Sequence, residues 1–361
     1  RAADHALIWG AATLGAGIVL LAPPAGWALV AGLGTIGAIA ALLVAGLAAD
    51  GAGWLLPVLP AALSLLLAAV TAAALLEGLG HRQRQRIRRS FEHYLDPQIV
   101  RRMLAGDTPP SLGGEHREIT ALFTDIAGFT GLAERLPAPQ LAELLNSYFE
   151  GMAEAVIRHG GLVNDFVGDG LIALFGAPME QPDHAARAVA AAEAADAFAR
   201  DFAQRLAKQG IAFGHTRIGV HTGSALVGNL GTRSRLKYGA LGDTLNVAAR
   251  LESLNRWIGT RILVSGETAS RAGAATLRLV GEAALAGRAA PIAVWSPWLA
   301  EAETAGRYAA AMEALRDGDA ATARRLLDAL AETRPDDLVI LFHRRRLAEG
   351  VCGLAIVPGG K

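Results

Sequence analysis

The sequence has almost no cysteine and no surplus of charge of either sign. Cys352 is the single cysteine among 361 residues, so a disulfide framework within the chain is excluded and a reducing compartment suits it. The 34 lysines and arginines equal the aspartates and glutamates in number. A nucleic-acid-binding protein usually has a broad basic face, and this balance argues against one. We therefore expect no nucleic-acid partner.

Charged side chains are also missing from the first part of the chain. Between residues 6 and 76 the only ionisable side chain is Asp50. Three apolar segments cover this region, and each is close to the ~20 residues that cross a bilayer core. They are Ala6–Ala22, Gly26–Ala48 and Trp54–Leu79. A soluble helical bundle would need polar helix faces, which these segments lack, so residues 1–80 are predicted to form three transmembrane helices.

Charge returns abruptly after the third segment. Residues 81–89 contain five arginines, and such a cluster beside a span marks the cytosolic side. We expect a multi-pass protein of the cell inner membrane whose part after residue 80 is cytoplasmic. Residues 81–114 are predicted to be a basic juxtamembrane helix and a linker, the linker lying at Gly106–Gly114. Because the chain starts with Arg1 rather than Met, we expect it to be a piece of a longer protein.

Apolar periodicities alternate between those of strands and helices from residue 115 to 298. The expected strands are 118–123, 162–166, 171–175, 216–222 and 225–227, and the expected helices are 137–159, 182–209 and 243–256. The opening order β-α-β-β-α-β is that of a ferredoxin-like split sheet, so the predicted fold class is α+β. Residues 299–361 are predicted to be a short helical tail, a helical pair that resembles one tetratricopeptide-like unit.

Two aspartates lie where strands end. Asp125 follows a predicted strand, and the turn at 127–130 after it could direct free N–H groups at an anion. Asp169 lies at the tip of a predicted hairpin, beside the Asp125 strand in a ferredoxin-like sheet. Two such carboxylates can share a pair of Mg²⁺ ions. The alternative at Asp125 is a carboxylate that merely caps the next helix.

A further polar pair lies on one predicted helix. Asn246 and Arg250 are four residues apart, so they share one helix face. The planar guanidinium of arginine suits a phosphate because it donates several hydrogen bonds. Taken alone, Arg250 would be better explained as a surface ion-pair residue.

Three motifs in order resemble the class III nucleotide cyclases. They are the stretches at 123–130, 167–170 and 241–252, and the resemblance covers roughly residues 115–298. The element at 94–97, the spans and the helical tail look like the membrane-bound bacterial branch with a CHASE-type sensor. In that branch the sensor precedes the spans, and this chain does not include it.

The resemblance implies a reaction and the residues for it. ATP would be converted to cyclic AMP and pyrophosphate when the ribose 3′-oxygen attacks the α-phosphate, with two Mg²⁺ or Mn²⁺ ions per site. Asp125, Asp169 and the Ile126 carbonyl would hold the metals, while Asn246 would orient the ribose and Arg250 would meet the α-phosphate. The turn residues Gly128, Phe129 and Thr130 would lie against the substrate. The site would be shared between the two subunits of a homodimer.

The sequence departs from the family at the base pocket. Adenylate cyclases usually have lysine at the position of Asp165, and aspartate or threonine at the position of Gly239. A basic residue that meets the triphosphate is replaced by Ala286, with Arg288 as a substitute nearby. A guanylate or relaxed-specificity cyclase therefore stays open as an alternative. A catalytically silent receptor that senses nucleotide is a second alternative, although the four residues expected to perform catalysis are all present.

Overall fold

The computed structural model describes residues 113–357, apart from 233–234, 274–275, 286 and 289. The three predicted membrane spans lie outside this part, as does most of the predicted segment 81–114. Among the residues that the structure describes, no helix is both long and apolar enough to cross a membrane. Gly113 and Gly114 begin a strand, because they pair with Asn229 and Gly228. The prediction that a linker extends to Gly114 is therefore wrong at its last two residues.

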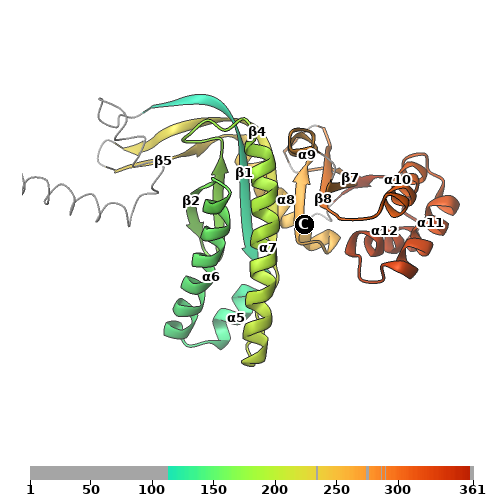
Figure 1. The fold of residues 1–361 in the computed structure, drawn as a ribbon, viewed down its shortest axis with the longest axis horizontal. Helices are drawn as coiled ribbons and strands as arrows, with labels where there is room; N and C mark the ends of the chain where they lie inside the picture. The colour runs from blue at the N-terminus through green and yellow to red at the C-terminus, as the bar shows by residue number, and fades with distance from the viewer. Residues whose placement is uncertain (1–112, 233–234, 274–275, 286, 289, 358–361) are drawn as a thin grey trace, which may run out of the picture. The chain divides into compact units, whose positions relative to one another are not determined.

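One mixed sheet runs through the described part of the chain (Figure 1). Its strand order is β2-β3-β1-β4-β6-β8-β7-β9, and β5 pairs with β4 beside this path. The strands are β1 Gly113–Ile126, β2 Leu162–Val167, β3 Gly170–Phe175, β4 Thr216–Thr232, β5 Arg235–Leu241, β6 Ile262–Ser265, β7 Leu277–Ala283, β8 Ile292–Pro297 and β9 Ala355–Ile356. The helices are α5 Phe129–Arg135, α6 Ala138–Arg158, α7 His184–Lys208, α8 Asp243–Ile258, α9 Gly266–Ala272, α10 Ala302–Arg316, α11 Ala320–Thr333 and α12 Leu338–Ala348.

The predicted ferredoxin-like arrangement is confirmed around β1. This strand lies between β3 and β4, antiparallel to both, and β2 pairs with β3. Successive side chains of β1 point to opposite faces of the sheet, so they belong to two different layers of the core. Leu122 and Ile126 join the cluster under α6 and α7, whereas Ile119 and Ala121 lie in a cluster with Ala248 of α8. β1 is thus covered by helices on both faces.

β4 is longer than the sequence predicts. We expected two short strands at 216–222 and 225–227, but Thr216–Thr232 is one strand. A Cβ on Gly223 would lie 2.8 Å from the Thr244 hydroxyl oxygen, so this glycine lets the first turn of α8 approach the strand. The same hydroxyl donates to the Ser224 carbonyl at 2.7 Å. The gap in the apolar pattern therefore reflects helix packing and not a break in the strand.

The part after residue 298 contains three helices where a pair was predicted. α12 breaks the apolar periodicity because polar side chains point into the core. His343 bonds the Val280 carbonyl through Nε2 at 2.8 Å, and Arg346 donates to the carbonyls of Gly353 and Ala355. β9 then pairs in parallel with β7. These helices share one hydrophobic cluster with α8, so the tail is continuous with the core of the preceding residues.

A buried ion pair fastens the tail to the sheet. Arg278 on β7 donates to both carboxylate oxygens of Asp337, at 2.7 and 2.6 Å, and both side chains are 8% exposed. The indole nitrogen of Trp298 donates to the same carboxylate at 3.1 Å. Asp337 also caps α12 by accepting from two backbone N–H groups.

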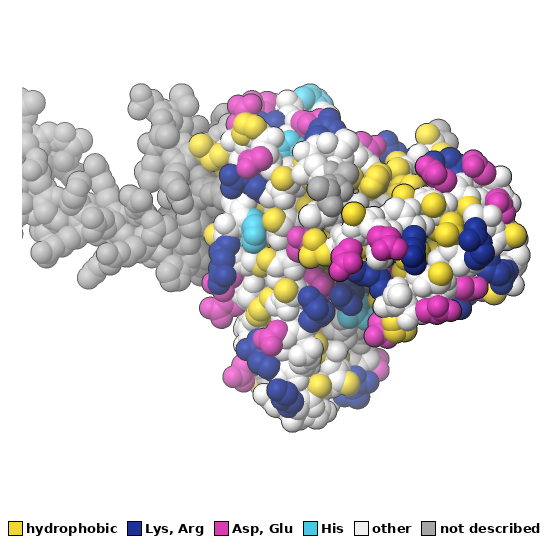
Figure 2. Space-filling model, turned by 45° about the vertical axis from the view of Figure 1, so that its right-hand side comes forward, with side chains coloured by type: hydrophobic (Ala, Val, Ile, Leu, Met, Phe, Trp, Pro, Cys, Tyr) yellow, Lys and Arg dark blue, Asp and Glu magenta, His cyan; other side chains and the backbone are white. Residues whose placement is uncertain are grey.

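On the surface of the molecule, Figure 2 shows acidic and basic side chains interspersed over the face turned to the viewer.

Candidate functional site

The two aspartates predicted to bind metal come together at one end of β1. The backbone N–H of Ile126 donates to Asp169 Oδ2 at 3.1 Å, which places this carboxylate beside the strand end that carries Asp125. Gly170 makes the approach possible, because a Cβ there would lie 2.3 Å from the Thr124 carbonyl oxygen. The Thr124 hydroxyl also accepts from the Leu171 N–H at 2.9 Å. The hairpin is therefore held against β1 with its acidic tip at the strand end.

The electrostatics of this pair favour a cation. Burial raises the pKa of Asp169, and the charge of Asp125 raises it further, while the hydrogen bond from Ile126 acts against both. Two carboxylates that disfavour each other's ionised form become stable together when a divalent ion lies between them. In the part of the chain described, no group of three or more His, Cys, Asp or Glu side chains could hold a metal alone. The two carboxylates fit Mg²⁺, which commonly takes one or two carboxylates and completes its shell with water and substrate phosphates.

Arg217 is a neighbour of Asp125 that sequence reasoning missed. The two residues are paired across β1 and β4, and their side chains form an ion pair. Arg217 Nε also lies 2.9 Å from Glu252 Oε1 on α8. Burial raises the pKa of Glu252, and Asp125 raises it further, whereas Arg217 lowers it. A cross-strand partner of Asp125 was foreseeable only once the register of β4 was known.

The turn after Asp125, which we expected to direct free N–H groups at an anion, leads into a short helix whose first side chain packs into the core. Gly128 is left-handed, with φ of 73°, and precedes the seven-residue helix α5. The Phe129 ring packs against the core under α6 and α7, while Thr130 is exposed. A cavity of about 380 Å³ lies beside this turn. It is lined by Ala127, Gly128, His215, Arg217, Asn255, Arg256 and Gly259.

Asn246 and Arg250 lie on the outer side of α8. The inner side faces β4, where a Cβ on Gly219 would lie 2.2 Å from the Ala248 carbonyl oxygen and from the Glu252 nitrogen. Asn246 is exposed. Arg250 is partly buried, and its Nη1 is enclosed without a hydrogen-bond partner. A buried guanidinium nitrogen without an acceptor costs free energy until one binds, so this face suits an anionic group.

Arg288 and the base-pocket positions lie near this face. The Arg288 guanidinium is 3.9 Å from the Asp243 carboxylate at the start of α8. Gly287 lies close to Arg250, since a Cβ on it would be 3.5 Å from Arg250 Nη2. Ala286 lies outside the described residues. Asp165 on β2 forms an ion pair with Lys237 on β5, and Gly239 lies further along β5.

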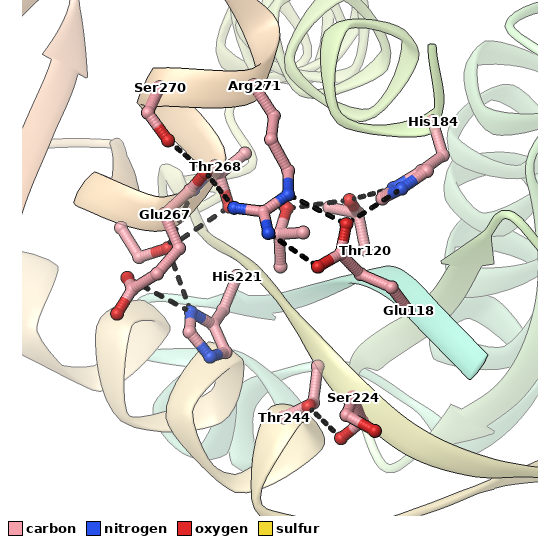
Figure 3. A network of polar contacts seen from close by, with 12 residues as sticks. Glu118, Thr120, His184, His221, Ser224, Thr244, Glu267, Thr268, Ser270 and Arg271 are labelled. Carbon is pink, nitrogen blue, oxygen red and sulfur yellow. Dashed lines mark hydrogen bonds and ion pairs between the residues drawn. The ribbon is translucent and has the colours of Figure 1, made fainter. Parts of the chain in front are cut away.

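A network of hydroxyl groups joins β1 and β4 to the helices packed beside them (Figure 3). His184 bonds Thr120 at 2.7 Å, and hydroxyl contacts of 2.8 to 3.1 Å continue from there to Ser265. His221 bonds Ser265 at 2.8 Å, and burial lowers the pKa of His221 to about 4. At the near edge, Arg271 donates to Glu118. The network thus joins α7 and α9 to the central strands with neutral histidines at both ends.

The predicted residues form two groups and not one. Asp125 and Asp169 form the first group, and Asn246 and Arg250 form the second. Glu252 reaches the first group through Arg217, and Arg250 is two residues from Glu252, or about 200° around the helix axis. Within one chain the second group therefore faces away from the carboxylates.

Comparisons with known proteins identify the family of this chain. Residues 113–295 match the family described as the adenylate and guanylate cyclase catalytic domain. Adenylate cyclase 1 of Rhizobium meliloti (strain 1021) is 36% identical over 177 residues, which are 49% of this chain and 27% of that protein. An uncharacterized protein of Mycobacterium tuberculosis (strain ATCC 25618 / H37Rv) is 36% identical over 228 residues, 62% of this chain and 38% of that protein. The chain thus spans well under half the length of these curated relatives.

A solved structure supports the fold. A bacterial light-regulated adenylyl cyclase has a TM-score of 0.54 at 23% identity, covering 63% of this chain and 65% of that chain. At this identity the likeness shows the fold alone. The family match extends over more than half of the 361 residues. The chain therefore belongs to the adenylate and guanylate cyclase family.

Proposed function

We propose that the chain converts ATP to cyclic AMP and pyrophosphate, as a homodimer whose two sites are shared between subunits. The observation that carries the proposal is the pairing of Asp125 with Asp169 at the end of β1. Membership of the cyclase family and the relative named adenylate cyclase 1 support this choice of reaction. The 3′-oxygen would form a bond to the α-phosphorus while the bond to the β-phosphate oxygen breaks. The hydroxyl proton would pass to solvent and pyrophosphate would leave.

The first group of residues would hold the metal ions. Asp125, Asp169 and the Ile126 carbonyl supply hard oxygen ligands at one strand end. Bound Mg²⁺ or Mn²⁺ would lower the pKa of the 3′-hydroxyl and neutralise charge on the triphosphate. Arg217 forms an ion pair with Asp125 from the neighbouring strand, so it orients that carboxylate.

The second group would bind the parts of the nucleotide that react. Arg250 has a buried nitrogen without a partner, which the α-phosphate would accept from. Asn246, one helical turn away, would orient the ribose through its exposed amide. These groups act by alignment and charge, which is what phosphoryl transfer chiefly requires. Arg288, close to the start of α8, would meet the triphosphate.

The direction in which the two groups face supports a shared site. In one chain Asn246 and Arg250 lie on the side of α8 turned away from Asp125, which favours a site to which two subunits contribute. A two-fold pairing of subunits can bring the metal group of one against the α8 face of the other, and it does so twice. The homodimer would then hold two equivalent sites.

Two other functions remain as alternatives to this proposal. Asp165 and Gly239 match neither standard base pocket, which leaves a guanylate or relaxed-specificity cyclase as the first. A silent receptor is the second, and the presence of all four residues argues against it, since nucleotide binding alone would not need paired metal carboxylates.

We further propose that three spans within residues 1–80 anchor the enzyme in the inner membrane with its catalytic part in the cytoplasm. The apolar runs and the arginines after them support this proposal.

One substrate comparison tests these choices. The purified chain is incubated with ATP or with GTP, each with Mn²⁺ or Mg²⁺, and cyclic nucleotide and pyrophosphate are quantified. We expect cyclic AMP and pyrophosphate in equal amounts. A larger yield of cyclic GTP would establish the first rival. Binding of nucleotide without any cyclic product would establish the second.

A further inference from the structure

A contact between two strands that are not neighbours in the sheet points to a base-recognition device, an inference that rests on the proposed function. β2 pairs with β3, and β5 pairs with β4, yet Asp165 on β2 forms an ion pair with Lys237 on β5. The Asp165 Oδ1 atom accepts the neighbouring Phe166 N–H at 3.1 Å. Both carboxylate oxygens of Asp165 therefore already have donors. We call the contact between β2 at residues 164–165 and β5 at residues 237–239 the seam. The Lys237 ammonium can give three hydrogen bonds, so it still has free donors at the seam.

The same seam contains an acceptor without a donor. Asn164 Oδ1 is buried and has no hydrogen-bond partner in the described part of the chain. It lies opposite Gly239, where a Cβ would be only 3.0 Å away. A side chain at position 239 would crowd this amide, so the glycine leaves room beside it. A buried amide oxygen without a donor is costly, and a ligand N–H that reached it would remove this cost.

The seam lies next to the helix face proposed to bind ribose and phosphate. β5 ends at Leu241 and α8 begins at Asp243, so one residue separates the strand of Lys237 from the helix of Asn246. Ala240 of β5, Leu162 of β2 and Ala248 of α8 share one buried cluster. A nucleotide with its ribose at Asn246 would thus have its base at the seam and not at the metal carboxylates.

The donors and acceptors at the seam can be matched to a purine. Adenine presents one donor, its N6 amino group, and one acceptor, N1. Guanine presents one acceptor, O6, and two donors, N1–H and the N2 amino group. The Asp165 carboxylate is already neutralised by the Lys237 ammonium, so the free donor of the seam is Lys237 and its unsatisfied acceptor is Asn164 Oδ1. Adenine matches this pair through N1 and N6, whereas the second donor of guanine would have to share an Asp165 oxygen that already accepts a hydrogen bond.

We propose that Lys237 and Asn164 together read the base and select adenine, and that Asp165 serves to hold Lys237 in place. Lys237 would donate to adenine N1, and Asn164 Oδ1 would accept from the N6 amino group. The assignment makes Asp165 a positioning residue. It also explains why an acidic side chain at this position is compatible with ATP as substrate.

The test measures binding and turnover separately, using the full chain. Equilibrium binding of 3′-deoxy-ATP and 3′-deoxy-GTP with Mn²⁺ reports base selection even if no turnover occurs. The variants are Lys237→Met, Asn164→Leu and the conservative Asn164→Asp, which keeps an acceptor oxygen. Lys208→Met removes an exposed lysine at the end of α7 and is the matched control. Circular dichroism of each variant confirms that it is folded.

We expect Lys237→Met and Asn164→Leu each to weaken 3′-deoxy-ATP binding by about tenfold or more, as loss of a hydrogen bond to a buried partner does. Binding of 3′-deoxy-GTP should change by less than about threefold in the same variants, since guanine gains less from the seam. With ATP as substrate the loss should appear in KM with kcat nearly unchanged, because base contacts form before the reaction. Asn164→Asp, which keeps an acceptor oxygen, should lose less 3′-deoxy-ATP affinity than Asn164→Leu, and Lys208→Met should bind 3′-deoxy-ATP much as the wild type does.

Three results would overturn the assignment. They are a wild type that binds 3′-deoxy-GTP more tightly, equal losses for both nucleotides in Lys237→Met, and unchanged selectivity in both Lys237→Met and Asn164→Leu. A wild type that binds 3′-deoxy-ATP selectively but makes no cyclic AMP would contradict the proposed activity, while loss of that selectivity in Lys237→Met would still support the base-reading pair.

Discussion

At the scale of single residues, folding disfavours the ionised form of the Asp169 carboxyl group. Its carboxylate is partly withdrawn from water and lies beside the charge of Asp125, and both effects raise its pKa. A raised pKa in the folded state means that the stability contributed by this group is present at low pH and is lost as pH rises through the folded pKa. At neutral pH the ionised Asp169 carboxylate therefore opposes folding until a cation binds.

Replacing Asp169 by asparagine should lower the activity without lowering the stability of the fold. Turnover is expected to fall by more than about a hundredfold, because a group that orders charge at the reacting phosphate is lost. In a metal chelator at pH 7, the melting temperature should equal or exceed that of the wild type, since the repulsion is gone. The gap between the two proteins should narrow as pH is lowered towards 4. A variant that melts well below the wild type at pH 7 would show that Asp169 is chiefly structural.

At the scale of helices and strands, close approach by glycine sets the position of the acidic hairpin. The Thr124 carbonyl oxygen lies where a side chain at position 170 would begin. Gly170→Ala should push the hairpin away from β1, costing about 1–3 kcal/mol of unfolding free energy as overpacking does. Turnover should fall by about a hundredfold, because a displacement near 1 Å misplaces a catalytic group to that extent.

A second glycine provides the control for this prediction. Gly306 lies in α10, and a Cβ there would meet nothing within 4 Å. Gly306→Ala should leave turnover unchanged and raise unfolding free energy by about 0.5–1 kcal/mol, the difference in helix propensity. Denaturant unfolding and initial rates of both variants decide the matter. Equal activity of Gly170→Ala and wild type would mean that the hairpin tolerates the shift.

His343 makes the attachment of α12 sensitive to acid. Burial lowers its pKa to about 3, the nearby charges of Arg346 and Arg278 add to this, and the hydrogen bond to Val280 opposes it. A lowered pKa means that the stability from neutral His343 is present above about pH 6.5 and is lost as pH falls towards 3. Between pH 7 and pH 5 the loss from this residue should reach about 2 kcal/mol.

His343→Gln tests this dependence, because glutamine keeps a donor for the Val280 carbonyl but does not titrate. Urea unfolding at pH 7 and pH 5 should show a smaller loss in the variant than in the wild type, by about 1–2 kcal/mol. The other buried histidines in the described residues, His184 and His221, are present in both proteins, so the comparison isolates position 343. Identical losses in the two proteins would contradict a buried neutral His343.

The sequence predicts most of the opening elements because their periodicities are regular. The helix expected at 137–159 is α6, and the strands expected at 162–166 and 171–175 are β2 and β3. Prediction fails where tertiary contact overrides local pattern, as in β4 at Gly223 and in α12 around His343. Asp125 and Asp169 could be selected from their places at strand ends, whereas Asn246 and Arg250 also needed the resemblance to the cyclases. Arg217, Asn164 and Lys237 could not be selected from the sequence, because their roles depend on which strands meet in space.

At the scale of the whole molecule, sharing of the sites makes a strong prediction for mixed dimers. Asp125→Ala removes a metal ligand from both sites of a homodimer, and Arg250→Ala removes the phosphate contact from both, so each variant alone should be inactive. In a mixed dimer one site has both defects and the other has neither. Purified mixed dimers should therefore have about half of wild-type activity, because one of their two sites works.

Co-expression with two different affinity tags, followed by purification through both, yields the mixed dimers. Initial rates of cyclic AMP formation are then compared with those of each variant purified alone. If sites were built within single chains, every chain would keep its own defect and no activity would return. Inactive dimers that demonstrably contain both variants would therefore exclude the shared site.

The position of β9 has a consequence for how the protein is made in the cell. This strand, at Ala355–Ile356, completes a sheet whose first strand begins at Gly113, and the helices just before it cover the apolar side of α8. Contacts so distant in sequence are slow to form. Ala355 of β9 pairs with Glu282 of β7, 73 positions earlier in the chain, so during synthesis at about 5–20 residues per second the edge of β7 would stay exposed for about 4–15 s. We expect a nascent chain arrested before β9 to depend on chaperones, because unpaired strand edges invite aggregation.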